Sequence, residues 1–395
     1  MQRTIRLKLH PSDIQAVALE GTTKLFTGAY NLGIDIAWQT GITNHIKLHY
    51  AAFRSIRDAF PDLVCDLACE ARKKAAETAR SAKGYEKAGH KVSKPNSKRC
   101  PPRFNHHTLK VDWGEKTVRM STVSGRQTIA FSLPEYVKKF IHGKVTTTDL
   151  ILKKSGWWLN VSVKLDAPIC EPTSGAIGID LGIVHPAVSD RAQFFGKRAW
   201  VAVDRRLFEL RRKLEAAGTK SARKHLRKLS GRQRRFRLDC DHVVSKQIVA
   251  TVEPGGSIVI ENLTGIRKPK KRKGALHQKK KLNKRMHNWS FAQLSSFIRY
   301  KAEDRGCTVV LVSPEHTSQT CSRCGFISQN NRPSRSVFSC GQCGYRLNAD
   351  LNAAKNILAK YRAAIGIPSG GGLPVNQPIV SKPLVLGTSC LTAMS

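Results

Sequence analysis

The sequence predicts a multidomain α+β protein, and three patterns lead to that prediction. A chain of 395 residues has room for roughly two to three domains. In its first half a helical segment interrupts a series of short strands, and in its second half apolar strands alternate with helices. Two Cys-x-x-Cys pairs in the last fifth of the chain have the spacing of a metal-binding insert.

The N-terminal half has the order β, α, β. Residues 2–9 (QRTIRLKL) alternate basic and apolar side chains, which indicates a strand with one basic face. Apolar residues at helical spacing predict helices over 14–83, and a linker rich in Gly, Lys and Pro follows over 84–105. Residues 107–166 contain several short strands, with Lys154-Ser155-Gly156 as a hairpin turn, and this spacing predicts a small barrel.

The C-terminal half contains three apolar strands. The segments AIGID (176–180) and SIVIE (257–261) each end in an acid, and CTVVLV (307–312) is the third strand. The segment IVHPAVSD (183–190) is expected to pair with the first strand as a hairpin. Helical and very basic sequence fills residues 198–250, which lie between the first two acid-ended strands.

The charge of the chain points to a polyanionic partner. Its 68 Lys and Arg against 28 Asp and Glu give a formal net charge of +40, which opposes compact folding unless a polyanion neutralises it. The excess is concentrated at 197–237, with sixteen basic and three acidic residues, and at 267–285. A charge run is usually a solvated face, and 268–273 also resembles a nuclear localisation signal. Two such dense regions favour a nucleic-acid channel instead.

Other partners and compartments fit the sequence less well. No apolar run approaches the about 18 residues that a membrane span needs, and no lipid-anchor motif is present, so we expect no membrane partner. The first residues, MQRTIRLKLHPSD, lack the apolar segment of a secretion signal. Eleven cysteines, an odd number with only four in closely spaced pairs, fit a reducing cytosol better than a disulfide framework. We therefore expect a cytoplasmic protein.

Three acids stand where an α/β sheet gathers its functional groups. Asp180 and Glu261 each end an apolar strand, and Asp350 opens a helix just after the cysteines. Three converging carboxylates would bind hard divalent cations, and two such ions would stabilise the attacking and leaving oxygens of a phosphodiester. Any one of these acids alone is better explained as a cap or an arginine partner. Glu261, however, opens an acid-free stretch that lasts until Glu303, where a buried carboxylate is costly unless it is used.

Four cysteines form the strongest local pattern in the sequence. They have the spacing of two knuckles around one tetrahedral Zn²⁺ ion, and a glycine follows each knuckle. Four thiolates leave no open coordination position, so the zinc should be structural; four unconnected free thiols are the alternative. The zinc ligands would be Cys321, Cys324, Cys340 and Cys343. The flanking arginines, which would contact phosphate or form a solvated face, are Arg323, Arg332, Arg335 and Arg346.

The order of the motifs resembles that of a known family. In chain order the motifs are GIDLG (178–182), IVIENL (258–263), SPEHTSQTCSRCG…CGQCG (313–344) and NADLNAAKNI (348–357). Together they resemble the TnpB family of transposon-encoded RNA-guided nucleases, and they are similar to the miniature type V CRISPR effectors with the same RuvC domain. The N-terminal half shares only its layout and the run Pro102-Arg103-Phe104. Many TnpB proteins have Asp-Arg-Asp where this chain has Asn348-Ala349-Asp350, a change that keeps the last acid.

The resemblance implies a domain layout. It implies an RNase H-like (RuvC) α/β catalytic domain with a zinc-ribbon insert, and an N-terminal β-barrel (wedge) interrupted by a helical recognition lobe. The expected domains are a wedge barrel at 1–10 and 105–171, a helical recognition lobe and linker at 11–104, a RuvC nuclease domain at 172–313 and 347–365, a zinc-ribbon target-nucleic-acid-binding insert at 314–346, and a disordered tail at 366–395.

The resemblance also implies an activity and its partners. By resemblance Asp180, Glu261 and Asp350 are the RuvC carboxylates, which would bind two Mg²⁺ ions and cut both strands of target double-stranded DNA beside a short adjacent motif. A guide RNA from the transposon end would supply the sequence specificity by base pairing, and we expect a monomer with its RNA, associated with the nucleoid of a prokaryote. The alternatives are a miniature type V effector, a guided DNA-binding protein without cleavage, and an unguided resolvase or RNase H-like enzyme.

Overall fold

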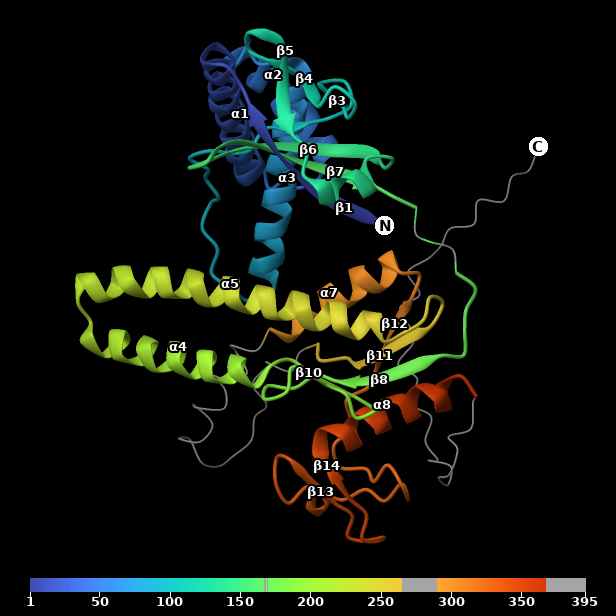
Figure 1. Ribbon diagram of the computed structural model, residues 1–395. Helices are drawn as coiled ribbons and strands as arrows, with labels where there is room; N and C mark the ends of the chain where they lie inside the picture. The colour runs from blue at the N-terminus through green and yellow to red at the C-terminus, as the bar shows by residue number, and fades with distance from the viewer. Residues whose placement is uncertain (167, 169, 265–289, 367–395) are drawn as a thin grey trace. The chain divides into compact units, whose positions relative to one another are not determined.

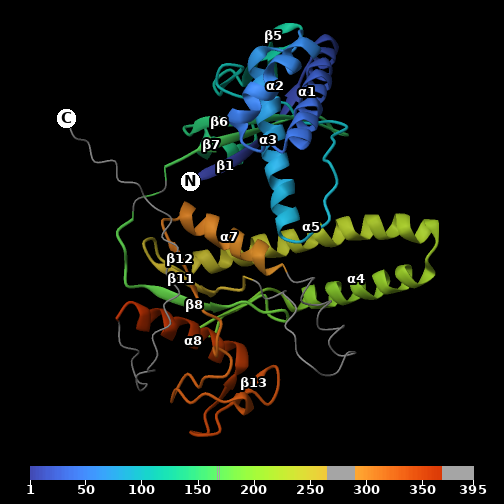
Figure 2. The ribbon, with the colours of Figure 1, turned by 180° about the vertical axis from the view of Figure 1, so that it is seen from behind.

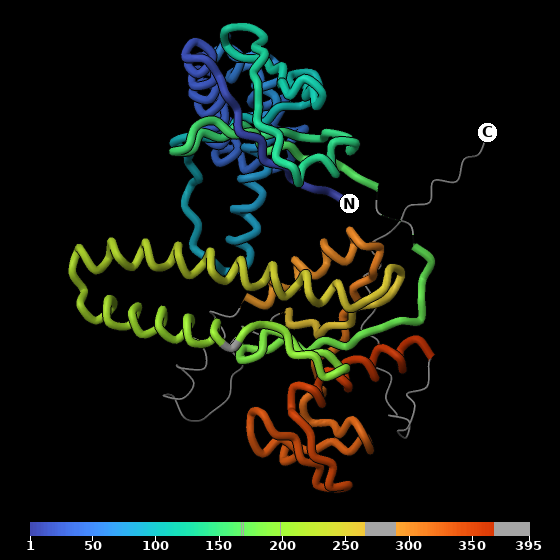
Figure 3. Tube along the Cα trace, in the orientation of Figure 1, coloured from blue at the N-terminus to red at the C-terminus, as the bar shows by residue number. Residues whose placement is uncertain are grey.

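The structure is a computed structural model, whose chain separates into two compact units, Met1–Asp166 and Ala167–Ser395 (Figure 1, Figure 3). Each unit is described by itself. The predicted basic loop at 267–285, and all but the first residue of the predicted tail at 366–395, lie outside the described residues. The structure describes every residue except 167, 169, 265–289 and 367–395.

Seven strands of the first unit form one antiparallel sheet in the order β2-β6-β7-β1-β5-β4-β3. The first strand lies in the middle, and its side chains alternate: Ile5, Leu7 and Leu9 are buried, whereas Arg6 and Lys8 are exposed. This confirms the predicted strand with a basic face. The strands from which the sequence predicts a barrel belong to this sheet, which has β2 and β3 as its outer strands. The strands are β1 (Gln2–His10), β2 (Arg103–Phe104), β3 (Leu109–Asp112), β4 (Thr117–Thr122), β5 (Gly125–Ser132), β6 (Lys144–Lys153) and β7 (Gly156–Lys164).

Three helices of the first unit lie beside this sheet (Figure 2). They share one hydrophobic core with it, in which Leu7 of the sheet and Phe26 of a helix are fully buried. The first helix begins with a capping box, because the Ser12 side chain accepts a hydrogen bond from Gln15 N and the Gln15 side chain accepts one from Ser12 N. It ends at Gly41, whose φ of 71° suits a left-handed C-cap. The helices are α1 (Asp13–Thr40), α2 (His45–Ala59) and α3 (Cys65–Lys87).

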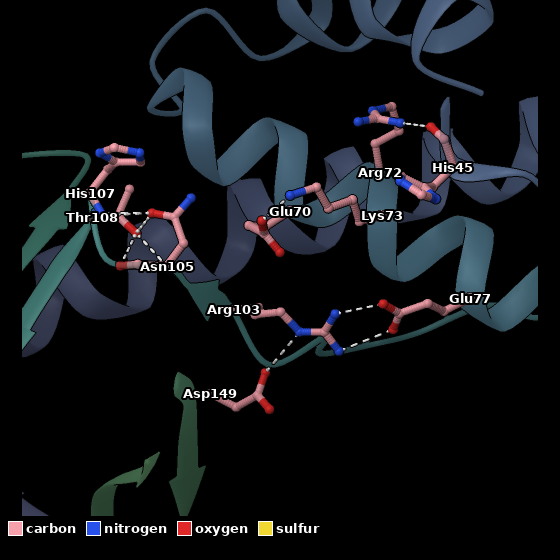
Figure 4. Close-up of polar contacts among 10 residues, drawn as sticks. All are labelled: His45, Glu70, Arg72, Lys73, Glu77, Arg103, Asn105, His107, Thr108 and Asp149. Atoms are coloured by element: carbon pink, nitrogen blue, oxygen red, sulfur yellow. Dashed lines mark hydrogen bonds and ion pairs between the residues drawn. The ribbon is translucent and has the colours of Figure 1, made fainter. Parts of the chain in front are cut away.

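A polar clamp joins the helices of the first unit to the edge of its sheet (Figure 4). Arg103 on β2 donates two hydrogen bonds to the carboxylate of Glu77 on α3, at 2.8 and 3.1 Å. Its Nε also lies 3.9 Å from Asp149 Oδ1 on β6, and Lys74 Nζ lies 2.7 Å from the same oxygen. A bidentate Arg–carboxylate pair fixes the orientation of the two side chains as well as their distance. The contacts of Arg103 therefore hold the two-residue strand β2 between α3 and β6.

The second unit is built on a five-stranded mixed sheet in the order β10-β9-β8-β11-β12. β8, β11 and β12 are parallel, whereas β9 is antiparallel to β8 and β10 is antiparallel to β9. The predicted hairpin that follows the first apolar strand is therefore confirmed. The strands are β8 (Ala176–Asp180), β9 (Ala187–Ser189), β10 (Phe194–Phe195), β11 (Ser257–Glu261) and β12 (Thr308–Val312).

Helices cover both faces of this sheet (Figure 1). α5 and α7 bury one face, where Ile179 packs with Val244, and α8 covers the other, where Val259 packs with Ile357. The predicted helical segment 198–250 is two helices, because Gly218 takes a left-handed φ of 61° and breaks it. None of the described helices is long and apolar enough to cross a membrane. The helices are α4 (Arg198–Ala217), α5 (Lys220–Ala250), α7 (Phe291–Asp304) and α8 (Ala349–Ala364).

Candidate metal centres

Two of the predicted acids end neighbouring parallel strands. Ile179 of β8 pairs with Ile260 of β11, so the next residues along the strands, Asp180 and Glu261, lie side by side. In both strands four buried residues precede a partly exposed acid. The sequence folds in this way because apolar strands buried on both faces place their first polar residue where the sheet ends.

The third acid reaches the same place from α8. Asn348 caps this helix, and its Oδ1 accepts hydrogen bonds from the backbone N–H groups of Asp350 and Leu351. The helix lies against β8 at Gly178, where an added Cβ would be only 2.4 Å from Ala354 O. A glycine at this position therefore lets α8 approach the strand closely, and the first turn of the helix brings its acid near the end of β8.

The charges of the other two carboxylates act on Asp180. Burial and the nearby charges of Glu261 and Asp350 raise the pKa of Asp180 to about 8. Burial also raises the pKa of Glu261. Arg332 partly offsets this accumulation of negative charge, since its Nη2 lies 3.4 Å from Asp350 Oδ1. Carboxylate oxygens are the ligands that a hard divalent cation such as Mg²⁺ prefers.

A threonine orients one of these carboxylates. Thr317 Oγ1 donates a hydrogen bond of 2.5 Å to Glu261 Oε1, and the residue is only 3% exposed. Thr317 lies in the segment between β12 and the first cysteine, and this segment is fastened to α8: Asn356 Nδ2 donates to the carbonyl oxygens of Thr317 and Thr320, at 2.8 and 2.7 Å. Asn352 Nδ2 donates to Thr320 O as well. The helix that carries Asp350 thus also holds the residue that orients Glu261.

The four predicted cysteines come together as one cluster, with all their Sγ atoms within 4.8 Å of one another. Sγ–Sγ distances of 3.7 Å (Cys321 to Cys343) and 3.6 Å (Cys324 to Cys340) agree with the about 3.8 Å expected between corners of a tetrahedron with Zn–S bonds of about 2.3 Å. Elsewhere in the described residues, no three His, Cys, Asp or Glu side chains gather closely enough to hold an ion as they stand; the three acids lie further apart. The cluster could therefore bind zinc.

Sequence reasoning missed two residues of the acidic site. It gave Arg332, like the other flanking arginines, either a phosphate contact or a place on a solvated face, whereas the guanidinium pairs with Asp350. It gave Thr317 no role, although the residue lies within the run SPEHTSQTCSRCG. The position of Thr317 in the sequence was the available signal. The segment between the third strand and the first cysteine starts at the end of a parallel strand, and the neighbouring strands carry acids at that same edge of the sheet.

The fold and the sites define a class of protein: a mixed α/β sheet with acids at its strand ends, followed directly by a four-cysteine cluster. Comparison with known proteins gives this class its relatives. A family model described as the Cas12f1-like TNB domain matches residues 291–357, from the start of α7 into α8. This match spans the third strand, the cysteine cluster and the third acid.

Curated relatives extend the likeness. The CRISPR-associated endodeoxyribonuclease Cas12f1 of Sulfoacidibacillus thermotolerans is 32% identical over 227 residues, which make up 52% of this chain and 50% of that protein. The putative RNA-guided DNA endonuclease InsQ of Escherichia coli K12 is 29% identical over 238 residues, or 56% of this chain and 58% of that protein. The matches thus span only about half the length of these curated relatives. The relatives of this chain include Cas12f endonucleases, InsQ and TnpB-like proteins.

A solved structure extends the likeness to the fold. The cryo-EM structure of a Cas12f1–sgRNA–target DNA complex matches with a TM-score of 0.60 at 17% sequence identity, over 88% of this chain and 83% of that chain. The chain therefore has a multidomain fold like that of a Cas12 effector.

Proposed function

We propose that the protein is an RNA-guided DNA endonuclease of the TnpB type, which cuts double-stranded DNA beside a short adjacent motif. The observation that carries this proposal is the register of β8 and β11, which sets Asp180 beside Glu261, with Asp350 near enough for its charge to act on Asp180. Acids gathered at a sheet edge, in a chain of net charge +40, suit phosphodiester hydrolysis better than binding alone. The names of the relatives support the same reaction class.

The strand order β10-β9-β8-β11-β12 supports an RNase H-like catalytic domain, since such a domain joins an antiparallel three-stranded meander to parallel strands. The fold likeness to the Cas12f1 complex supports the overall layout. The domains that we propose are RuvC at 172–313 and 347–365, a zinc ribbon at 314–346, a wedge barrel at 1–10 and 105–171, and a recognition lobe with its linker at 11–104.

In this proposal Asp180, Glu261 and Asp350 hold two Mg²⁺ ions, which when bound supply an activated water and stabilise the leaving oxygen. The protein contributes the orientation of its carboxylates. Asp180 and Glu261 come from adjacent strands and so are fixed relative to each other by the sheet. The hydroxyl of Thr317 holds one oxygen of Glu261, and Arg332 is suited to contact the phosphate that is cut, next to Asp350.

The four cysteines would hold one Zn²⁺ ion with a structural role. All four positions of a tetrahedral ion are taken by thiolates, so none is left for water or substrate. The ion would fasten the ribbon whose first segment carries Thr317, four residues before Cys321.

The partners in this proposal are a guide RNA from the transposon end and target double-stranded DNA. α4 and α5 form a helical hairpin in which Arg237 Nη2 lies 3.0 Å from Asp204 Oδ2, while most of the remaining basic side chains are exposed. Such a surface suits a phosphate backbone read for shape and charge. We propose that the protein acts in the cytoplasm as a monomer with its RNA.

The test is cleavage by the purified protein–RNA complex. The complex should cut a matching duplex in Mg²⁺ and stop when the metal is chelated, while protein without RNA should cut nothing. Asp180→Asn should abolish cutting and leave RNA binding unchanged. Target protection without nicking by the unaltered complex would instead support a guided DNA-binding protein, and cutting by RNA-free protein would support an unguided enzyme.

The RNA itself separates the two nuclease alternatives. Sequencing of the copurified RNA should give a transcript that ends at the transposon end for a TnpB-type enzyme. A transcript with CRISPR repeats would instead identify a miniature type V effector, whose proposed site and chemistry are the same.

A further inference from the structure

An exposed aromatic ring lies in line with the acids of the second unit. Asp180 pairs with Val188 across β8 and β9, and Val188 pairs with Phe194 across β9 and β10. Residues directly opposite in antiparallel strands project from the same face, so the ring of Phe194 projects from the face that carries the carboxylate of Asp180. Two strand spacings, roughly 10 Å, separate their backbones.

The ring is large, exposed and rigidly carried. Phe194 is 44% exposed, whereas Val188 between it and Asp180 is 1% exposed. The β9–β10 hairpin is closed by hydrogen bonds from Ser189 N to Gln193 O and from Gln193 N to Ser189 Oγ, at 2.9 and 3.1 Å. The ring of Phe194 also packs edge to face against the ring of His185, with 5.1 Å between the ring centroids. A side chain held in this way gives up little conformational freedom when it binds a ligand.

Further exposed apolar side chains directly precede His185 in the chain. Ile183 and Val184, in the turn that directly follows β8, are 41% and 51% exposed. Single exposed apolar residues are ordinary, but these two follow Asp180 by three and four residues, and Phe194 lies in register with it. Basic residues accompany them, since Arg191 and Lys197, on either side of β10, are exposed. A flat exposed ring in a segment that also carries cationic residues suits a single nucleic-acid strand, which offers base faces and phosphates in alternation.

We infer that Phe194, supported by His185, is a stacking platform for an unpaired nucleobase of the strand that is cut, next to the scissile phosphate. This inference rests on the proposed nuclease function and adds a subsite to it. The platform would hold the strand in position beside Asp180 and would favour unpaired over paired substrate, because a base within a duplex has its faces covered by its neighbours.

The first test uses cleavage. In the full complex with its RNA, Phe194→Ala should slow cutting by about five- to tenfold, the lower part of the range for loss of one stacked base, and Phe194→Trp should retain cutting. Phe194→Leu, which keeps apolar bulk without a flat ring, should be slowed nearly as much as the Ala variant. The control is Tyr136→Ala, which removes an exposed ring (54%) from the first unit and should cut at the normal rate.

Abasic substrates then separate stacking from a general defect. For the unaltered protein, one abasic nucleotide near the cut should slow cleavage at a single position. Phe194→Ala should be insensitive to the abasic nucleotide at that position, because the interaction is already lost. The inference would be overturned if Phe194→Ala cut at the normal rate. It would also be overturned if Phe194→Ala cut more slowly than the unaltered protein by the same factor on every substrate, including the one with the abasic nucleotide at that position.

A binding readout keeps the inference independent of cleavage. A partly single-stranded target with 2-aminopurine beside the cut position is bound to the RNA complex in Ca²⁺. The fluorescence of this base should be quenched by the unaltered protein and by Phe194→Trp, and should recover with Phe194→Ala. Quenching without any cutting in Mg²⁺ would remove the nuclease proposal and leave the stacking site standing. Equal quenching by the unaltered protein and by Phe194→Ala, at every labelled position, would overturn the stacking site.

Discussion

The cysteine cluster and the acidic cluster are neighbours in one unit, and they are built in opposite ways. The cysteines come from one short stretch, Cys321–Cys343, and their Sγ atoms already lie within 4.8 Å of one another. The acids come from two strands and a helix, between Asp180 and Asp350, and burial together with the charges of the other two acids raises the pKa of Asp180 to about 8. The first arrangement fits an ion that helps the chain to fold, and the second fits ions that a folded scaffold holds for chemistry.

The largest effect should follow from loss of the cysteine-bound ion. Zinc binding to such a site supplies on the order of 10 kcal/mol of folding free energy. Cys340→Ser should therefore remove the metal and abolish the hydrogen-exchange protection of residues 320–348, while the first unit keeps its protection. Zinc content and hydrogen exchange by mass spectrometry measure these effects.

The matched control for this change is Cys65→Ser, an exposed cysteine of the first unit. It should leave both the zinc content and the protection of the ribbon unchanged. A Cys340→Ser protein that retains one zinc per chain and a protected ribbon would show that the cluster is not a metal site.

A substitution in the acidic cluster should have the opposite effect: the protein should lose activity and keep its fold. Glu261→Gln keeps the volume of the side chain but removes a charge, so cleavage should fall by roughly 10⁴-fold, as when one member of a catalytic unit is removed. Zinc content should not change. The melting temperature measured without Mg²⁺ should not fall, because burial disfavours the charge that this change removes. The control is Glu315→Gln, whose side chain is 57% exposed; cleavage that falls equally in both variants would contradict the assignment of Glu261.

The comparison also explains what the sequence can predict. Spacing alone defines the cysteine cluster, because all its ligands lie in one short segment. The burial pattern and the order of the strands define Asp180 and Glu261, since four buried residues followed by an acid place that acid at the end of a strand. Arg332 and Thr317 were missed because their partners, Asp350 and Glu261, are brought to them only by the packing of the ribbon segment against α8.

The fold also has features that the sequence predicts and features that it does not predict. Single elements such as the basic-faced strand Gln2–His10 and the hairpin of β8 with β9 follow from local alternation of residue types, and both are confirmed. The pairing of β1 between β5 and β7 does not follow from it. Non-local pairing depends on which apolar faces fit together, and a single sequence does not display that information.

The close approach of α8 to β8 can be disturbed by a substitution that changes none of the three acids. Gly178→Ala would place a Cβ 2.4 Å from Ala354 O, so we expect a loss of about 1–3 kcal/mol of stability and slower cleavage, because the helix that carries Asp350 has to shift. Thermal unfolding and cleavage rates measure these effects. The control Gly231→Ala meets only Arg235 Nη1 at 3.5 Å and should raise the stability of α5 by about 1 kcal/mol or less; equal effects of the two changes would contradict the packing argument.

The smallest effect should come from the hydrogen bond between Thr317, in the ribbon segment, and Glu261. Thr317→Val keeps the shape of the side chain but removes the hydroxyl that donates to Glu261 Oε1. Loss of such an outer hydrogen bond typically costs about 10–100-fold in metal affinity or activity. The concentration of Mn²⁺ or Mg²⁺ that gives half-maximal cleavage should therefore rise, while the maximal rate at saturating metal falls less.

Thr317→Ser makes this prediction specific, because it restores the hydroxyl and removes only a methyl group. If the hydroxyl orients Glu261, serine should return the metal requirement close to its original value, although the buried methyl is still missing. A serine variant as impaired as the valine variant would mean that Thr317 matters through packing alone. The Thr317 hydroxyl would then not connect the two clusters, and the pair of Arg332 with Asp350 would be the contact through which zinc loss could reach the acids.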